Sequence, residues 1–295
     1  MTPIDGSPAA PSNRGSRSAP SFAQADGVRI RIHHLGGSGP PLLAVHATGF
    51  HGRVWEPFVP PLRVHFSVIA LDQRGHGDSD KPESGYEWTK FGEDVLAVID
   101  HLGLETPVGI GHSAGATALV FAESRRPGTF SRLVLMDPTL LPPEFRSVAP
   151  ASFNPMSEQA RRRRAIWSSR DEMIDRLRDG SPLAEWRDDF LRSYVTYGTD
   201  TLPDGTVRLK CPPEVEAQVY AEASSHDGWE RLAELRCPTL LLTGESSHMW
   251  AGGRSQLAAG QIRNGRAEVV KGGHFFPMED PETATERILG FLTRR

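Results

Sequence analysis

The chain has 295 residues, of which 24% are charged and 38% hydrophobic, as in a soluble globular protein with one sizeable domain or two small ones. Its formal net charge of -4 excludes a broad basic surface that would attract nucleic acid. No apolar stretch approaches the length of a membrane span, and two cysteines do not make a disulfide framework in a chain this long. We therefore expect no nucleic-acid or membrane partner, and we interpret Cys211 and Cys237 as reduced.

Residues 1–20 are rich in proline, serine, alanine and glycine and have no apolar core. Because this composition does not suit a signal peptide or an anchor, we interpret the segment as a disordered tail and expect a cytoplasmic protein. After it, Asp26-Gly27 lies between two strand-like runs, 21–25 and 28–34. An Asp-Gly pair in this position predicts a β-hairpin.

Strand and helix patterns then alternate along the chain. An amphipathic helix is expected over 88–102, where apolar side chains recur on one face and Gly103 ends the pattern. A closing helix is expected over 281–291 with Asp280 as its N-cap. Buried strands are predicted at 41–46, 67–71, 106–110, 132–136, 238–243 and 267–270, with helical stretches at 54–62 and 116–122.

This alternation predicts a mostly parallel sheet covered by helices on both faces. It is interrupted at 139–236, which is polar and shows no apolar strand, so we predict an inserted helical lid there. The expected organisation is thus a tail at 1–20, a core in two parts at 21–138 and 237–295, and the lid between these parts. Such sheets bind ligands beyond the carboxyl ends of their strands, and the lid would rise over that edge.

The segment Gly111-His112-Ser113-Ala114-Gly115 has the pattern G-x-S-x-G and lies between a predicted strand and a predicted buried helix. A serine at such a turn has a strained backbone and an exposed hydroxyl, and the flanking glycines let the chain pack closely around it. The alternative is a helix that merely begins with small residues. The position between strand and helix favours Ser113 as a nucleophile.

A serine hydroxyl becomes a good nucleophile when a base takes its proton. Of the 11 histidines, His274 has the position that fits this role, because it follows the last predicted strand in a glycine-containing loop. A loop histidine on the surface is the structural alternative. We predict that His274 is the base.

A carboxylate should orient that histidine. Asp137 ends the strand before the lid, Glu245 follows the strand after the lid, and Ser247 stands where an aspartate is expected. Neighbouring strands lie about 5 Å apart, so either carboxylate could reach one histidine. We predict Asp137 as the acid because its side chain is shorter and stiffer, with Glu245 as the alternative. A role of Asp137 in capping the turn before Pro138 competes with this prediction.

Acyl transfer also needs N–H groups that stabilise a developing oxyanion. Ala114 at the turn supplies one, and we predict Thr48, in the loop after 41–46, as the other, with Ala47 and Gly49 as alternatives. His112 is also interpreted as packing beside the turn, and His248 as solvent-exposed or touching substrate. The expected pocket residues are Phe50, Trp55, His112, His248 and Trp250.

The stretch 72–79 is polar and glycine-rich, and we interpret it as tying loops together near the site. A phosphate site is the alternative, but the pattern G-x-x-x-x-G-K-[ST] does not occur. No pair of histidines or cysteines has a spacing typical of a metal site, so no metal is expected. The four arginines at 161–164 are interpreted as a solvated helix face.

Together these motifs resemble the α/β-hydrolase family. The resemblance is carried by His46-Ala47-Thr48-Gly49, the stretch 72–79, the G-x-S-x-G segment and Gly273-His274. It implies an eight-stranded, mostly parallel sheet with a lid inserted after strand six, no cofactor, and hydrolysis through an acyl-enzyme. The order Ser113, Asp137, His274 matches the family's order of nucleophile, acid and histidine, and some members carry the acid where Asp137 stands. The sequence departs from the family pattern at Ser247 and Ala47.

We therefore predict a cofactor-free serine hydrolase that cleaves a small carboxylic ester or lactone. Hydrolysis of a carbon–carbon or amide bond uses the same three residues and stays open as an alternative. A ligand receptor with little turnover is the alternative from another class. The sequence identifies neither the substrate nor the oligomeric state.

Overall fold

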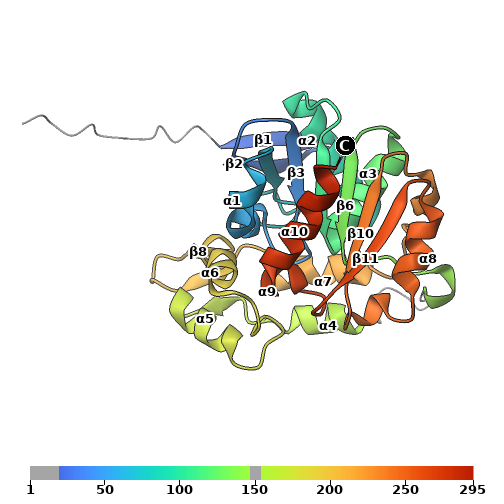
Figure 1. Ribbon diagram of the computed structural model, residues 1–295. Coiled ribbons are helices and arrows are strands. Elements are labelled where there is room, and N and C mark those ends of the chain that lie inside the picture. The colour runs from blue at the N-terminus through green and yellow to red at the C-terminus, as the bar shows by residue number, and fades with distance from the viewer. Residues whose placement is uncertain (1–19, 147–153, 295) are drawn as a thin grey trace, which may run out of the picture.

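The computed structural model describes residues 20–146 and 154–294 (Figure 1). Its centre is an eight-stranded sheet in the order β1-β2-β4-β3-β5-β6-β10-β11. This confirms the predicted α/β class and the mostly parallel sheet. The strands are β1 (Ser21–Ala25), β2 (Val28–Gly36), β3 (Pro41–Val45), β4 (Ser67–Leu71), β5 (Val108–His112), β6 (Arg132–Met136), β10 (Thr239–Gly244) and β11 (Gly265–Val270).

The antiparallel part of the sheet is confined to its N-terminal edge. β1 pairs with β2 and β2 pairs with β4 in antiparallel fashion, whereas every pairing from β4 to β11 is parallel. The predicted hairpin is confirmed: Asp26 and Gly27 both have positive φ, 51° and 79°, as a tight two-residue turn requires. Nearly all of the predicted tail, residues 1–19, lies outside the described residues.

Each face of the sheet is covered by its own layer of helices. Adjacent residues of β3 point to opposite faces, so Leu43 packs in one buried apolar cluster and Leu42 in the other. The first layer contains α2 (Trp88–Leu102), α3 (Ala114–Arg125) and α8 (Arg254–Gln261). The second contains η1 (Gly52–Phe58), α1 (Val59–Leu62), α9 (Phe276–Glu279) and α10 (Pro281–Leu292).

The segment between β6 and β10 is only partly helical. It holds η2 (Pro143–Phe145), α4 (Pro155–Arg161), α5 (Arg170–Arg178), α6 (Asp188–Tyr197), α7 (Pro213–Ala221) and η4 (Glu230–Glu234). It also contains a small antiparallel sheet of β7 (Ile166–Trp167), β8 (Thr199–Thr201) and β9 (Val207–Leu209). The predicted helical lid therefore also contains short strands, which the sequence did not indicate because strands of two or three residues are too short to show an alternating pattern.

Figure 1 places this inserted segment beyond the end of the sheet at which β6 leads into it. Its helix α6 reaches the core, since the ring of Tyr194 meets that of Phe50 edge-on at 5.4 Å. The arginine run at 161–164 is not simply a solvated face. Arg161 pairs with Glu158 and Glu214, and Arg164 pairs with Glu172. Arg163, whose side chain is 28% exposed, pairs with the buried Glu216 and donates to Tyr194 Oη.

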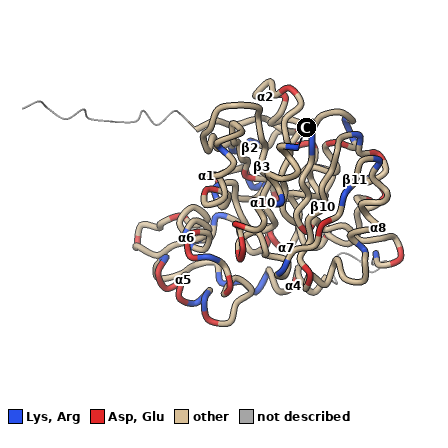
Figure 2. Tube along the Cα trace, in the orientation of Figure 1, with Lys and Arg blue, Asp and Glu red and all other residues tan. Residues whose placement is uncertain are grey.

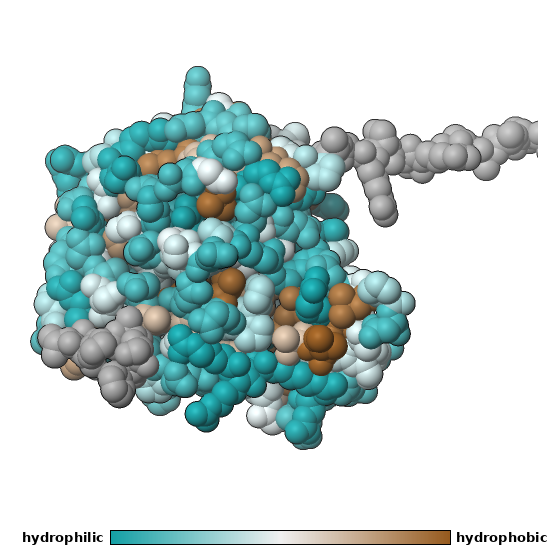
Figure 3. Space-filling model, turned by 180° about the vertical axis from the view of Figure 1, so that it is seen from behind, coloured by the Kyte–Doolittle hydropathy of each residue, from teal (hydrophilic) through white to brown (hydrophobic). Residues whose placement is uncertain are grey.

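The outer surface is mainly hydrophilic on the face opposite to Figure 1, where apolar areas are small and separated (Figure 3). Among the described helices, none combines the length and apolar character needed to cross a bilayer. Cys211 and Cys237 are buried free thiols, as predicted.

Candidate active site

Ser113 occupies the sharp turn between β5 and α3. Its backbone has φ 53° and ψ -119°, a strained conformation for a residue with a side chain. The two glycines of the motif are needed for close packing. A Cβ on Gly115 would lie 2.3 Å from the carbonyl oxygen of Val45, and one on Gly111 would lie 2.6 Å from Ala116 N. The alternative of an ordinary helix start does not explain this strain.

The surroundings of the Ser113 hydroxyl are polar but confined. The residue is 7% exposed, and its Oγ lies 3.3 Å from Thr139 Oγ1. Thr139 follows the β6 end and was not singled out by the sequence, because nothing in its neighbourhood marks it as functional. Ala114 begins α3, so its N–H has no partner within the helix and stays available beside Ser113.

Asp137 and His274 form a hydrogen-bonded pair at the same edge of the sheet. His274 Nδ1 lies 2.9 Å from Asp137 Oδ1. The carboxylate is fully buried and also accepts hydrogen bonds from Gly244 N at 3.0 Å and from Ser247 Oγ at 2.7 Å. Glu245, the alternative acid, is exposed. Of the two carboxylates that the sequence left open, the structure therefore brings Asp137 to His274.

His112 links the serine turn to the histidine loop. Its Nε2 lies 2.8 Å from the carbonyl oxygen of His274, and the two rings are 4.9 Å apart between centroids. Burial lowers the pKa of His112 to about 3, so this imidazole is neutral and donates from Nε2.

Ser113 and His274, both described residues, form no hydrogen bond with each other. Catalytic hydrogen bonds of this kind often tighten only when substrate binds.

The loop after β3 begins directly against the serine turn, since a Cβ added to Gly115 would lie 2.5 Å from the carbonyl oxygen of His46. Gly49 N donates to His76 Nε2 at 2.9 Å and is therefore engaged. The N–H groups of Thr48 and Ala47 have no hydrogen-bond acceptor among the described residues. This leaves Thr48 as the predicted second oxyanion donor, with Ala47 as its alternative.

The expected pocket residues differ in their surroundings. Phe50 and His112 belong to a group of aromatic rings that reaches His274. By contrast, Trp55 packs on Phe58, Trp250 packs on Trp229 and donates to Pro138 O, and His248 is exposed. The structure thus does not support these three as pocket residues. The group instead includes three residues that sequence reasoning missed, namely Trp186, Tyr194 and Phe275.

The polar stretch 72–79 ties loops together, as predicted. The buried carboxylate of Asp72 accepts from Gly52 N at 2.6 Å and from Asp78 N at 2.7 Å. Arg74 forms a bidentate pair with the buried Asp94 of α2. The Arg74 guanidinium is engaged by Asp94 and by Gly85 O, so it is not free to bind a phosphate.

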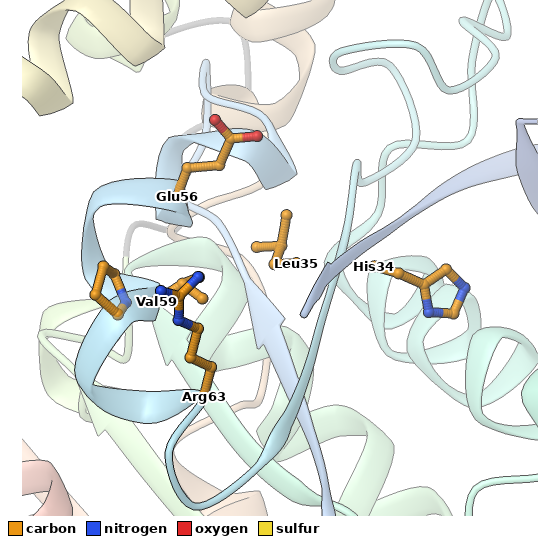
Figure 4. A pocket seen from close by; sticks show the side chains of 6 residues that line it. His34, Leu35, Glu56, Val59 and Arg63 are labelled. Atoms are coloured by element: carbon orange, nitrogen blue, oxygen red, sulfur yellow. The ribbon is translucent and has the colours of Figure 1, made fainter. Parts of the chain in front are cut away.

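A surface hollow of about 270 Å³ lies away from these residues (Figure 4). None of its lining side chains belongs to the loops that carry Ser113, Asp137 and His274. We therefore do not assign it to the candidate site. It is lined by His34, Leu35, Glu56, Val59, Pro60 and Arg63.

Comparison with known proteins places this arrangement in a family. The sequence pattern of the alpha/beta hydrolase family matches residues 42–287. The chain is 40% identical over 101 residues to 2-(acetamidomethylene)succinate hydrolase of Mesorhizobium japonicum, a match covering 34% of this chain and 36% of that protein. It is 23% identical over 259 residues to 3-oxoadipate enol-lactonase 1 of Acinetobacter baylyi, covering 86% and 89%. The crystal structure of E-2-(acetamidomethylene)succinate hydrolase superposes with a TM-score of 0.81, 24% identity, and coverage of 93% and 99%.

Proposed function

The chain belongs to the α/β-hydrolase family, and we propose that it is a serine hydrolase that cleaves a small carboxylic ester or lactone through an acyl-enzyme. The observation that carries this proposal is the Asp137–His274 hydrogen bond of 2.9 Å at the sheet edge where Ser113 occupies its strained turn. A nucleophile, a base and an orienting acid are the parts that acyl transfer needs.

The proposed reaction begins with attack of Ser113 Oγ on the substrate carbonyl carbon while His274 Nε2 takes the hydroxyl proton. The N–H groups of Ala114 and Thr48 stabilise the oxyanion. His274 then gives its proton to the leaving alkoxide, and the acyl-enzyme remains. A water molecule transfers a proton to His274 and attacks the acyl carbon. His274 then gives this proton to Ser113 Oγ as the bond between Oγ and the acyl carbon breaks, which releases the acid and restores Ser113. Asp137 stabilises the imidazolium at both stages.

The ester or lactone class is supported by the match to an enol-lactonase, which extends over most of both chains. Amide hydrolysis is the second candidate, because the relative with 40% identity is named for an acetamido compound. That match covers only about a third of either chain. Hydrolysis of a carbon–carbon bond would use the same three residues, Ser113, Asp137 and His274, and stays an alternative. The partner is a small molecule in each case, and the cytoplasmic location stays a prediction.

The first test is Ser113→Ala, assayed with p-nitrophenyl esters of graded acyl length and with a fluorophosphonate probe. Loss of the nucleophile should lower kcat by at least about 10⁴-fold and abolish labelling. Wild-type protein that neither turns over any ester or amide nor reacts with the probe would contradict the proposal and favour a receptor.

The second test separates the two acids. Asp137→Asn should lower kcat by about 10⁴-fold, because the amide no longer stabilises the imidazolium, whereas Glu245→Gln should leave kcat within about twofold. If only the glutamate change cripples the enzyme, Asp137 has been assigned the wrong role.

A further inference from the structure

Ser247 lies in the loop after β10, next to the parallel strand β6 that ends at Asp137. Its hydroxyl donates to Asp137 Oδ1 at 2.7 Å. This is the same carboxylate oxygen that faces His274 Nδ1 at 2.9 Å. Both Ser247 and Asp137 are buried, so water does not compete for this oxygen.

The backbone and the side chain of Ser247 have separate tasks. The backbone shapes the turn, since its N–H donates to Gly244 O and its carbonyl accepts from Trp250 N, both at 3.1 Å. The hydroxyl makes its only described hydrogen bond to Asp137. A substitution that removes the hydroxyl therefore keeps both backbone bonds and changes the environment of the carboxylate.

We infer that Ser247 is a positioning residue for the proposed reaction. By donating a hydrogen bond to Asp137 Oδ1, it holds that oxygen against His274. The inference rests on the proposed function.

The effect of removing the hydroxyl follows from geometry. Without the Ser247 donor, Asp137 Oδ1 loses one of the hydrogen bonds that fix it against His274, so the imidazole is oriented less well for proton transfer.

The experiment measures kcat and KM of p-nitrophenyl acetate hydrolysis for wild type, Ser247→Ala, Ser247→Thr and Ser246→Ala. Ser246 is the matched control, since its hydroxyl ties the same loop to Gly272 O at 2.9 Å without touching Asp137. For Ser247→Ala we expect kcat to fall about tenfold with KM within about twofold. Ser247→Thr should restore kcat, and Ser246→Ala should leave kcat within about twofold. Equal kcat values for Ser247→Ala and Ser246→Ala would overturn the inference.

Failure of the proposed function has a different signature, since Asp137→Ala itself would then leave hydrolysis unchanged.

Discussion

The sheet edge and the inserted segment differ in where most of their ion pairs lie. In the core, Arg74 and Asp94 are 2% and 0% exposed and form a bidentate pair that fastens the loop after β4 to α2. In the inserted segment, charges of both signs crowd α5 and α6 (Figure 2), and pairs such as Arg192–Asp188 are more than half exposed. Buried pairs depend strongly on each partner, whereas exposed pairs contribute little. The rigid frame of the site therefore lies in the core.

The largest effect on activity should come from the serine turn. Gly115→Ala would place a Cβ within 2.5 Å of the carbonyl oxygens of Val45 and His46. We expect loss of activity and a free energy of unfolding lower by about 3 kcal/mol or more, since backbone must move. Urea denaturation and the ester assay measure both. Gly260→Ala is the control: this helical glycine has open space around its Cβ position, so Ala should be neutral or stabilising.

The buried ion pair of the core comes next. Arg74→Met should lower the free energy of unfolding by about 3–5 kcal/mol, because Asp94 is left buried without its partner. Arg74→Met/Asp94→Leu should recover most of this loss. A single variant as stable as wild type would show that the pair does not hold the loop.

Acid should lower the free energy of unfolding, because histidines that are buried and neutral in the folded chain become protonated when the chain unfolds. Burial lowers the pKa values of His51, His76 and His226 to about 4 in the folded chain. Between pH 4 and about 6.5 the unfolded chain therefore binds protons that the folded chain does not. The free energy of unfolding should fall as the pH drops through this window, by about 1.4 kcal/mol per pH unit for each histidine. Urea midpoints at pH 7, 6 and 5 measure this, and a flat profile would contradict it.

The smallest effect should come from the inserted segment. Asp188→Asn removes a carboxylate that pairs with both Arg178 and Arg192. Because these side chains are exposed, the melting temperature should not change measurably, and salt should not alter that result. A clear loss of stability would mean that the surface ion pairs act as a network.

The sheet could be predicted in detail because its strands are short apolar runs bounded by turn residues. The predicted strands at 67–71 and 132–136 and the helix at 88–102 have the bounds observed for β4, β6 and α2. Ser113 stood out for the same local reason, since glycines two residues before and after it are needed wherever the backbone turns this sharply. Local patterns of this kind are read from neighbouring residues alone.

The inserted segment and the aromatic group around His274 lacked such signals. Trp186, Tyr194 and Phe275 are far apart in sequence and meet Phe50 only when the chain is folded.

The sequence by itself predicts an α/β sheet with a serine turn and a histidine loop at one edge. It can do so because apolar periodicity and glycine positions are local patterns that span only a few residues. Which carboxylate meets His274 was decided only by tertiary structure. The register of β6 against β10 brings Asp137 within hydrogen-bonding distance of Ser247 and His274, while Glu245 is left at the surface. Distances between side chains on different strands depend on how the whole sheet packs, and no local pattern encodes them.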